Sequence, residues 1–530
     1  MAEGSDTMNE PVETEETMGL PRSFRVTSID LETGEYTVIM NRTDASVLGL
    51  RSLDRVKVST ERDSMTAIVE LTDSVVADGH VGVLKKGREK LRTSQDDIVR
   101  IVPVARPRSI EIIKKRLNGE ELSSEEIETL TDEITNHRLS DVELSAFVCS
   151  TYMKPLVNRE IKDLTLAMVR SGEMIDIDVE PVFDFHSIGG VPGNKVTLLV
   201  VPIVAAAGLH IPKTCSRAIS SAGGTADILE TIANVTLPGW KIKEITETIG
   251  GTIAWGGGVN IAPADDIIIR AEYPLSIDPY SQVIASVLAK KKAVGADHLL
   301  MDIPVGPHTK VETMDLARKY ARDFMDIGEK IGINVQCAIT YGGQPVGRNI
   351  GPALEVKEAL MVLENEPPSS STLEKATSLA GIILEMGGLS GDGRKEAMRI
   401  LRSGEALAKF HEIIEAQGSE FKNITSDQVP IGDQMATVES TNSGYVSTIN
   451  NKDLVRIARA AGCPHDKFGG IILEKKIGHQ VEKGEVLFKI YSSNEQRLKM
   501  AVQTAKKLDP FNIEGMVLER VPGERVIHSI

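Results

Sequence analysis

Two glycine-rich turns, each set between a short apolar segment and a helix-like segment, constrain the fold of this chain most strongly. The first glycine turn is residues 187–195, SIGGVPGNK, and the second is residues 216–225, SRAISSAGGT. The segments that follow them, 196–208 and 226–233, are helix-like. A helix start offers unpaired N–H groups and a positive dipole end, and glycine lets an anion approach them closely. The pair predicts a phosphate-handling site.

A single Gly-Gly turn is also typical of a plain connection between a strand and a buried helix. Neither turn is a Walker loop, because no Gly-Lys-Ser/Thr follows, and neither is a clean dinucleotide fingerprint. Hydroxyl groups in the two turns, together with a cation at Arg217, favour phosphate; the hydroxyl groups are those of Ser187, Ser216, Ser220, Ser221 and Thr225. In open α/β sheets ligands bind at the carboxyl ends of strands, where we expect both turns to lie.

Composition excludes several classes of protein. A net charge of −16 argues against a general nucleic-acid or membrane surface, and 4% aromatic residues disfavour a stacking platform for single strands. The longest apolar run, 198–209, is shorter than the roughly 20 residues that span a bilayer. The acidic N-terminus does not resemble a signal peptide. Four widely spaced cysteines predict neither a zinc site nor a disulfide framework, so we expect a cytoplasmic protein.

Changes in periodicity predict a multidomain α/β chain with five parts. Residues 1–22 form an acidic tail that we expect to be disordered. Residues 23–104 alternate with period two and predict a small β-barrel serving assembly. Residues 105–180 predict a helical lobe, 181–435 an α/β catalytic domain with a part returning to the helical lobe, and 436–530 a C-terminal α+β domain.

The pattern also places individual elements. Ser123 and Ser124, ahead of two glutamates, indicate a helix start. The expected helices in the helical lobe are 109–117, 124–136, 141–152 and 158–171. The expected strands are 24–29, 36–40, 55–58, 66–69 and 98–102 in the barrel, and 298–303 and 334–339 in the α/β domain.

Residues 217–230, RAISSAGGTADILE, match the signature R-A-I-x-x-A-G-G-T-x-D-x-L-E of the thymidine/pyrimidine-nucleoside phosphorylase family. Residues 185–195 resemble that family's KHSTGGVGDK motif, and 285–291 and 343–348 match further segments. The resemblance extends over about residues 105–520. It implies the fold of the nucleoside phosphorylases and phosphoribosyltransferases, in which a helical lobe and an α/β lobe flank a cleft that closes on substrate.

The departures from this family are informative. Phe185 stands where the nucleoside enzymes have a phosphate-binding lysine, and Cys215 replaces a usual serine. The arginine expected near residues 270–273 for pyrimidine nucleosides is not clear, an N-terminal domain is added, and segment 303–310 ends in Lys310. Together these features resemble the nucleotide-specific branch, the archaeal AMP phosphorylases. The resemblance implies that AMP and phosphate give adenine and ribose 1,5-bisphosphate, with CMP and UMP also possible. No cofactor or metal is implied, because inorganic phosphate is a substrate.

The resemblance makes Asp278 the proton donor to the departing base. A carboxylic acid donates at neutral pH only where its surroundings raise its pKa. An Asp before Pro279 is also a common helix cap, and the two roles can coexist.

The same transfer assigns ten residues to the nucleotide and phosphate: Gly190, Ser216, Arg217, Ala218, Ile219, Ser220, Ser221, Thr225, Ser286 and Lys310. Lys310 is expected at the 5′-phosphate, although a lone lysine is usually a surface residue. Ser286 lies on an apolar helix, where its hydroxyl could instead bond to the backbone. His186 is ranked lower as a structural histidine, and Cys215 and Phe185 are expected only to pack.

Three other functions stay open. They are a pyrimidine nucleoside phosphorylase, an anthranilate-type phosphoribosyltransferase that needs Mg²⁺ and a pyrophosphate donor, and a non-enzymatic nucleotide-binding platform built on the barrel. The family's helical lobe usually forms a dimer, and the added barrel suggests a larger homo-oligomer.

Overall fold

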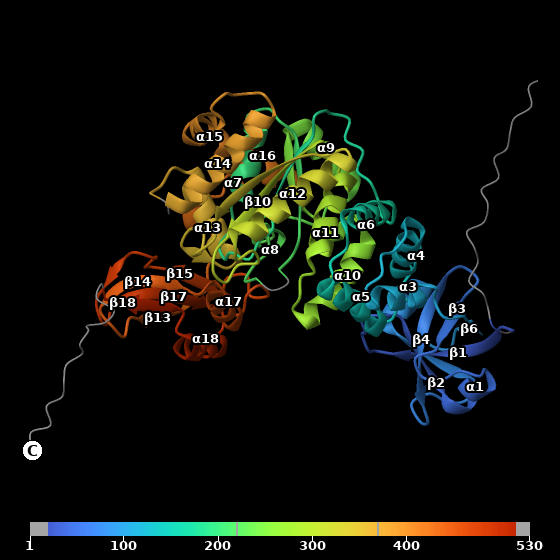
Figure 1. The fold of residues 1–530 in the computed structure, drawn as a ribbon. Helices are drawn as coiled ribbons and strands as arrows, with labels where there is room; N and C mark the ends of the chain where they lie inside the picture. Colours follow the sequence, from blue (N-terminus) through green and yellow to red (C-terminus); the bar gives the residue numbers. More distant parts are fainter. Residues whose placement is uncertain (1–17, 19, 219–220, 368–369, 516–530) are drawn as a thin grey trace, which may run out of the picture. The chain divides into compact units, whose positions relative to one another are not determined.

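The structure is a computed structural model that describes residues 18, 20–218, 221–367 and 370–515 (Figure 1). The chain divides into two compact units. The first comprises Met1–Ala167 and Ala264–Ser281, and the second comprises Met168–Pro263 and Gln282–Ile530. Within the described ranges, no helix is both long enough and apolar enough to cross a membrane.

The first unit begins with a closed six-stranded barrel in the order β1-β5-β2-β4-β3-β6, which confirms the predicted β-barrel. Side chains that alternate along the strands fill its interior, as Val56 and Val58 do on β3. Gly82 on β5 lets that strand approach its neighbours, since an added Cβ would lie 2.5 Å from Ile29 Cδ1. The strands are β1 (Arg22–Ile29), β2 (Thr37–Asn41), β3 (Arg55–Ser59), β4 (Ser64–Thr72), β5 (His80–Leu84) and β6 (Ile98–Pro103), with short helices α1 (Arg42–Val47) and α2 (Lys85–Leu91).

The helical lobe occupies the rest of the first unit. Its helices are α3 (Ser109–Leu117), α4 (Ser124–Thr135), α5 (Asp141–Met153), most of α6 (Asn158–Arg170) and most of α10 (Pro263–Leu275). α4 begins as predicted, because the Ser123 hydroxyl accepts the Glu126 N–H and the Glu126 carboxylate accepts the Ser123 N–H. This capping box satisfies two N–H groups that the helix cannot pair internally.

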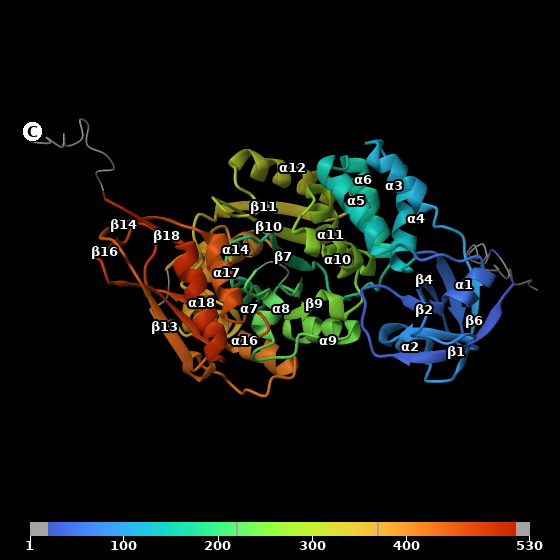
Figure 2. The same ribbon diagram turned by 90° about the horizontal axis from the view of Figure 1, so that it is seen from below.

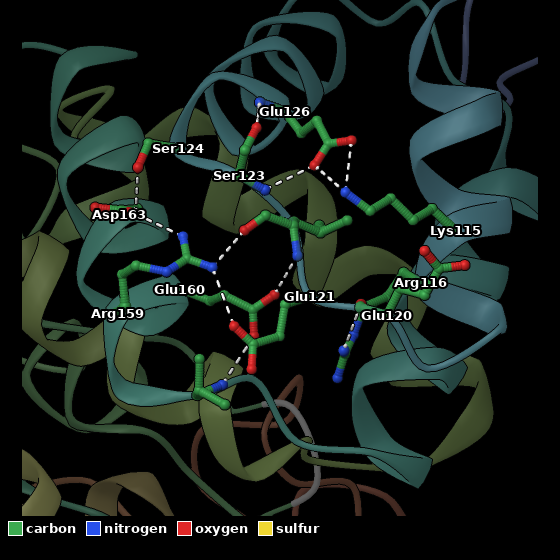
Figure 3. Close-up of polar contacts among 12 residues, drawn as sticks. Lys115, Arg116, Glu120, Glu121, Ser123, Ser124, Glu126, Arg159, Glu160 and Asp163 are labelled. Carbon is green, nitrogen blue, oxygen red and sulfur yellow. Dashed lines mark hydrogen bonds and ion pairs between the residues drawn. The ribbon is translucent and has the colours of Figure 1, made fainter.

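A polar network ties α4 to α6 and to the end of α3 (Figure 3). The buried Glu160 carboxylate accepts the N–H of Leu122 at 2.7 Å and that of Val157 at 2.9 Å. Arg159 donates to the Leu122 carbonyl at 2.6 Å, and Lys115 pairs with Glu126 at 2.7 Å. Buried charge is therefore matched by hydrogen-bonding groups, as stability requires.

The second unit is built on parallel strands. One sheet has the order β11-β10-β7, and β8 pairs with β9 beside it, the two linked by a parallel bridge from Val182 to His210. Because these strands run in the same direction, their carboxyl ends meet at one edge of the sheet (Figure 2). The strands are β7 (Phe183–Ser187), β8 (Ile211–Cys215), β9 (Gly251–Trp255), β10 (His298–Val305) and β11 (Asn334–Tyr341).

Helices cover these strands. α7 is apolar on all sides and almost wholly buried, which places it at the centre of the largest core. α14 and α16 pack against α7, and α12 packs against β10 and β11. The helices are α7 (Thr197–Ala206), α8 (Thr225–Leu229), α9 (Gly239–Ile249), α11 (Tyr280–Ala293), α12 (Met314–Lys330), α13 (Pro352–Leu363), α14 (Ser370–Met386), α15 (Gly393–Arg402) and α16 (Glu405–Ala416).

The C-terminal domain is α+β. Its first sheet has the order β12-β15-β17-β13 and its second the order β16-β14-β18. The edge strand β12 comes from the α/β part of the chain and pairs with β15. The elements are β12 (Asn349–Ile350), β13 (Gln434–Glu439), β14 (Gly444–Ile449), β15 (Gly470–Leu473), β16 (Gln480–Val481), β17 (Val486–Ser492) and β18 (Phe511–Glu514), with α17 (Asn451–Ala460) and α18 (Glu495–Leu508). The predicted multidomain α/β architecture is confirmed.

Candidate active site

The first glycine turn follows β7 at the carboxyl edge of the sheet. Its backbone is left-handed at Gly189 and Gly190, where φ is +86° and +85°, a conformation that favours glycine. A Cβ added to Gly190 would lie 2.5 Å from the backbone nitrogen of Lys310. Two residues predicted to bind the nucleotide are therefore in contact, because the loop after β10 packs against this turn.

A buried carboxylate beneath the first turn holds it in place. Asp302, on β10, accepts the Ser187 hydroxyl at 2.7 Å and the Thr340 hydroxyl at 2.5 Å. Its charge is balanced by Lys375 at 2.8 Å. Asn194 in turn donates to the Ser187 oxygen at 2.9 Å. The Ser187 hydroxyl thus braces the turn as both donor and acceptor.

The second glycine turn follows β8 and is held by side chains. The buried Asp227 carboxylate accepts the N–H of Ala218 at 2.6 Å and that of Gly224 at 3.0 Å. Arg217 donates to both oxygens of Glu230, at 2.6 and 2.7 Å, and lies 4.6 Å above the Trp255 ring. The hydrogen bond from Arg217 is the main cause that lowers the pKa of Glu230 to about 2. The Arg217 guanidinium, which the sequence predicts to bind phosphate, is therefore paired with carboxylates in this structure.

Lysines gather around His186, the last residue but one of β7. Burial lowers the pKa of His186 well below its usual value, and the charges of four lysines lower it further: Lys213, Lys290, Lys291 and Lys310. The Nδ1 atom of His186 is buried and has no hydrogen-bond partner in the described part of the chain. A neutral imidazole inside a cationic group is an arrangement that attracts an anion.

Two of these lysines are deeply buried. Lys291 forms an ion pair with Asp184 at 2.7 Å, and both Lys291 and Lys213 donate to the Thr214 carbonyl. Burial lowers the pKa of Lys291 to about 7, although the Asp184 carboxylate opposes the shift. The helix α11 is thereby anchored to β7 and β8, and Ser286 lies half-buried one turn before Lys290 on the same helix.

The other predicted residues are placed as follows. Ser216 is exposed immediately after β8, the Ser221 hydroxyl donates to the Gly223 carbonyl at 3.1 Å, and Thr225 begins α8. Ile219 and Ser220 lie outside the described residues. Asp278 is exposed in the segment between α10 and α11, within the first unit. The roles assigned to all of these residues stay predictions.

The sequence analysis assigned no role to Asp184, Lys213, Lys291 or Asp302. Asp184, Lys213 and Asp302 are charged residues inside short, mostly apolar segments, which is the signal that could have identified them, whereas Lys291 is the middle of three consecutive lysines and carries no such signal. Phe185 is buried in the core, and the Cys215 thiol donates to the Ala254 carbonyl while burial raises its pKa to about 11. In the ranges that the structure describes, no group of three or more His, Cys, Asp or Glu side chains could hold a metal ion.

Family models match three parts of the chain. Residues 110–172 match the helical bundle domain of a glycosyl transferase family, and residues 179–261 match its a/b domain. Residues 445–511 match the pyrimidine nucleoside phosphorylase C-terminal domain. The fold is also similar to the crystal structure of anthranilate phosphoribosyltransferase from Thermus thermophilus, with a TM-score of 0.50 and 18% identity. That likeness covers 57% of this chain and 98% of the other.

Similarity to whole proteins is much stronger. AMP phosphorylase of Methanocella arvoryzae is 48% identical over 500 residues, which cover 94% of this chain and 99% of that protein. AMP phosphorylase 1 of Archaeoglobus fulgidus is 48% identical, covering 94% and 98%. AMP phosphorylase of Thermococcus kodakarensis is 46% identical, covering 94% and 99%. At this identity over nearly the full length, the chain belongs to the AMP phosphorylase family.

Proposed function

We propose that this chain is a pentosyltransferase that converts AMP and inorganic phosphate into adenine and ribose 1,5-bisphosphate. Relatives that match over nearly their whole length bear the name of this activity. The structural observation that carries the proposal is the group of four lysines around His186, beside two glycine turns at the carboxyl edge of the sheet. In a chain with a net charge of −16, such a concentration of cations predicts an anionic ligand.

The chemistry fits these residues. An oxygen of phosphate bonds to C1′ of the ribose while the bond from C1′ to the base nitrogen breaks, through a transition state with oxocarbenium character. Phosphate needs positioning and charge neutralisation, which glycine N–H groups and lysines supply without covalent help. Asp278 delivers a proton to the departing base, and Lys310 binds the 5′-phosphate. No metal or cofactor enters the reaction.

The same site would accept CMP and UMP, because the phosphate and ribose contacts do not depend on the base. The predicted nucleotide-binding residues form the rest of the site. We further propose a cytoplasmic homo-oligomer, with dimers joined through the helical lobe and assembled further through the barrel.

Incubation of the full chain with AMP and phosphate, without metal, tests the proposal. We expect phosphate-dependent release of adenine and ribose 1,5-bisphosphate, with little release from adenosine. Release from uridine or thymidine alone would make the protein a nucleoside phosphorylase, an alternative that the match to that C-terminal domain keeps open. Activity only with Mg²⁺ and a pyrophosphate donor would identify a phosphoribosyltransferase.

Asp278→Asn tests the proton donor. We expect AMP binding to persist while kcat falls by about 100-fold or more, since general acid catalysis typically contributes that much. Asp315→Asn is the control, because Asp315 is a fully exposed aspartate on α12. Unchanged turnover in Asp278→Asn would remove the acid from this position.

A further inference from the structure

The C-terminal domain makes several hydrogen bonds to the loop that follows β11. Lys476 donates to the carbonyls of Pro345 and Gly347, the latter at 2.8 Å. From the other side, Arg348 of the loop donates to the C-terminal domain's Leu473 and Glu474 carbonyls, at 3.0 and 2.7 Å. Two further bonds add to these: the Ile477 N–H to the Gln344 side chain at 3.0 Å, and Asn451 to the Gly342 carbonyl at 2.9 Å. Residues 342–348 therefore have their conformation set by another domain.

The same loop is in contact with the first glycine turn. The Val346 N–H donates to the Pro192 carbonyl at 3.1 Å, and the Val346 carbonyl accepts Lys195 at 3.1 Å. A Cβ added to Gly193 would lie 2.6 Å from the Val346 oxygen, so the two backbones touch. A shift of loop 342–348 would consequently move the turn that carries Gly190.

A buried carboxylate locks these parts together. Glu358 on α13 pairs with Lys195 at 2.8 Å, and both side chains are almost fully buried. Glu358 also accepts the backbone N–H groups of Arg348 and Asn349, at 3.1 and 2.8 Å. One carboxylate thus binds the end of the glycine turn and the end of loop 342–348 at once.

We propose that Lys476 is a positioning residue for phosphate, acting from the C-terminal domain through loop 342–348 on the first glycine turn. The inference rests on the proposed function, which places phosphate at the N–H groups of the glycine turns and the nearby lysines. Lys476 does not need to touch phosphate. It holds the carbonyls of Pro345 and Gly347, which flank the contacts that Val346 makes with Pro192 and Lys195.

The protonation of Lys476 gives this role a measurable signature. Burial lowers the pKa of Lys476 to about 7, helped by the charges of Lys195 and Arg348 and opposed by Glu358. The pKa of His479 is lowered mainly by partial burial, and the charge of Lys476 lowers it further. Above that pH the amine has two N–H groups in place of three and loses its charge, so its grip on the loop weakens. We expect the KM for phosphate to rise through neutral pH.

Lys476→Met removes the ammonium and keeps most of the length of the side chain. We expect the KM for phosphate to rise about tenfold at pH 6.5 with kcat changed less than about twofold, since small misplacement of a binding group is costly. The rise of KM through neutral pH should be smaller in this variant, and what remains comes from other groups that titrate in this range, such as Lys291. Lys483→Met, an exposed lysine of the same domain, is the control and should behave as wild type.

Equilibrium binding of radiolabelled phosphate to the full chain separates this inference from the proposed function. A weaker phosphate affinity in Lys476→Met supports the positioning role even if the wild type does not turn over AMP. Unchanged affinity and unchanged KM in a folded variant would overturn it. If Lys476→Met does not fold, Gln344→Leu and Arg348→Met release the same loop, and wild-type phosphate affinity in both would equally overturn it.

Discussion

The two glycine turns look alike in sequence and are built in different ways. The first depends on its backbone, because left-handed glycines let neighbouring main-chain atoms approach within contact distance. The second is fixed by carboxylates, because Asp227 accepts two of its N–H groups and Glu230 fixes its arginine. Its glycines have no left-handed φ, although a Cβ added to Gly224 would lie 2.5 Å from the Ser216 carbonyl oxygen. A Gly-Gly pair therefore does not by itself tell whether glycine is needed for its φ angle or only for close approach of the backbone.

Gly190→Ala should break the first turn with the largest effect. Left-handed strain of about 1–2 kcal/mol and a backbone clash of about 1–3 kcal/mol add to roughly 4 kcal/mol, or about a thousandfold in kcat/KM for phosphate. Gly189→Ala is a matched control, since Gly189 has the same left-handed φ but an added Cβ would have no neighbour within 4 Å. Equal losses in both variants would show that strain alone matters.

The acids behind the two turns should respond to pH in opposite directions. Burial raises the pKa of Glu355, beside the first turn's Lys195, from 4.5 to about 7. Because the folded protein holds the Glu355 proton more tightly than the unfolded chain does, this group contributes on the order of 3 kcal/mol to folding stability. That contribution is fully present below pH 4.5 and is lost as the pH rises through about 7. Relative to wild type, Glu355→Gln should gain thermal stability between pH 4.5 and 7 in calorimetry.

Glu230→Gln is the control for this window. The lowered pKa of Glu230 contributes stability above pH 4.5 that is lost as the pH falls towards 2. The difference in thermal stability between Glu230→Gln and wild type should therefore stay constant between pH 4.5 and 7. If the difference in thermal stability between Glu355→Gln and wild type is equally constant, the buried Glu355 does not titrate between pH 4.5 and 7.

Asp227→Asn should disturb the second turn with a smaller effect. Hydrogen bonds to a charged group are worth about 1.5–3 kcal/mol, and the amide retains part of them, so we expect a loss of about 2 kcal/mol. The KM for phosphate measures the effect on the site. Glu230→Gln should weaken the site less than Asp227→Asn does, because the partly exposed Glu230 carboxylate binds side chains rather than the turn's own N–H groups. The opposite order would mean that Arg217 matters more than the backbone contacts.

Local signals in the sequence were sufficient for many elements. The Ser123 and Glu126 pair and helical periodicity predicted α4 to within one residue, and α3 begins and ends as predicted. β5 was not predicted, because Gly82 interrupts its pattern, although that glycine permits the close strand contact. Both turns lie at the carboxyl ends of strands, as the order of apolar segments indicated.

The site was less accessible from the sequence. Motifs identified Gly190 and Lys310, which the structure brings into contact. The pairs Asp184–Lys291 and Asp302–Lys375 join residues far apart along the chain, and no local pattern reports such partners. Arg217 was predicted from its sequence position to bind phosphate, and this role stays a prediction; in the structure its guanidinium contacts Glu230, Asp227 and the Trp255 ring.

Strand β12 has a consequence for dividing the protein. Only two residues long, it supplies the edge of the C-terminal sheet from a point more than eighty residues before β13, the next strand of that sheet along the chain. A fragment beginning at residue 436 would leave the N–H and C=O groups on one side of β15 unpaired. Open strand edges recruit other strands, so such a fragment would be prone to self-association. Cutting the chain at this point, by proteolysis or by gene truncation, would therefore give a fragment that aggregates rather than a domain that folds independently.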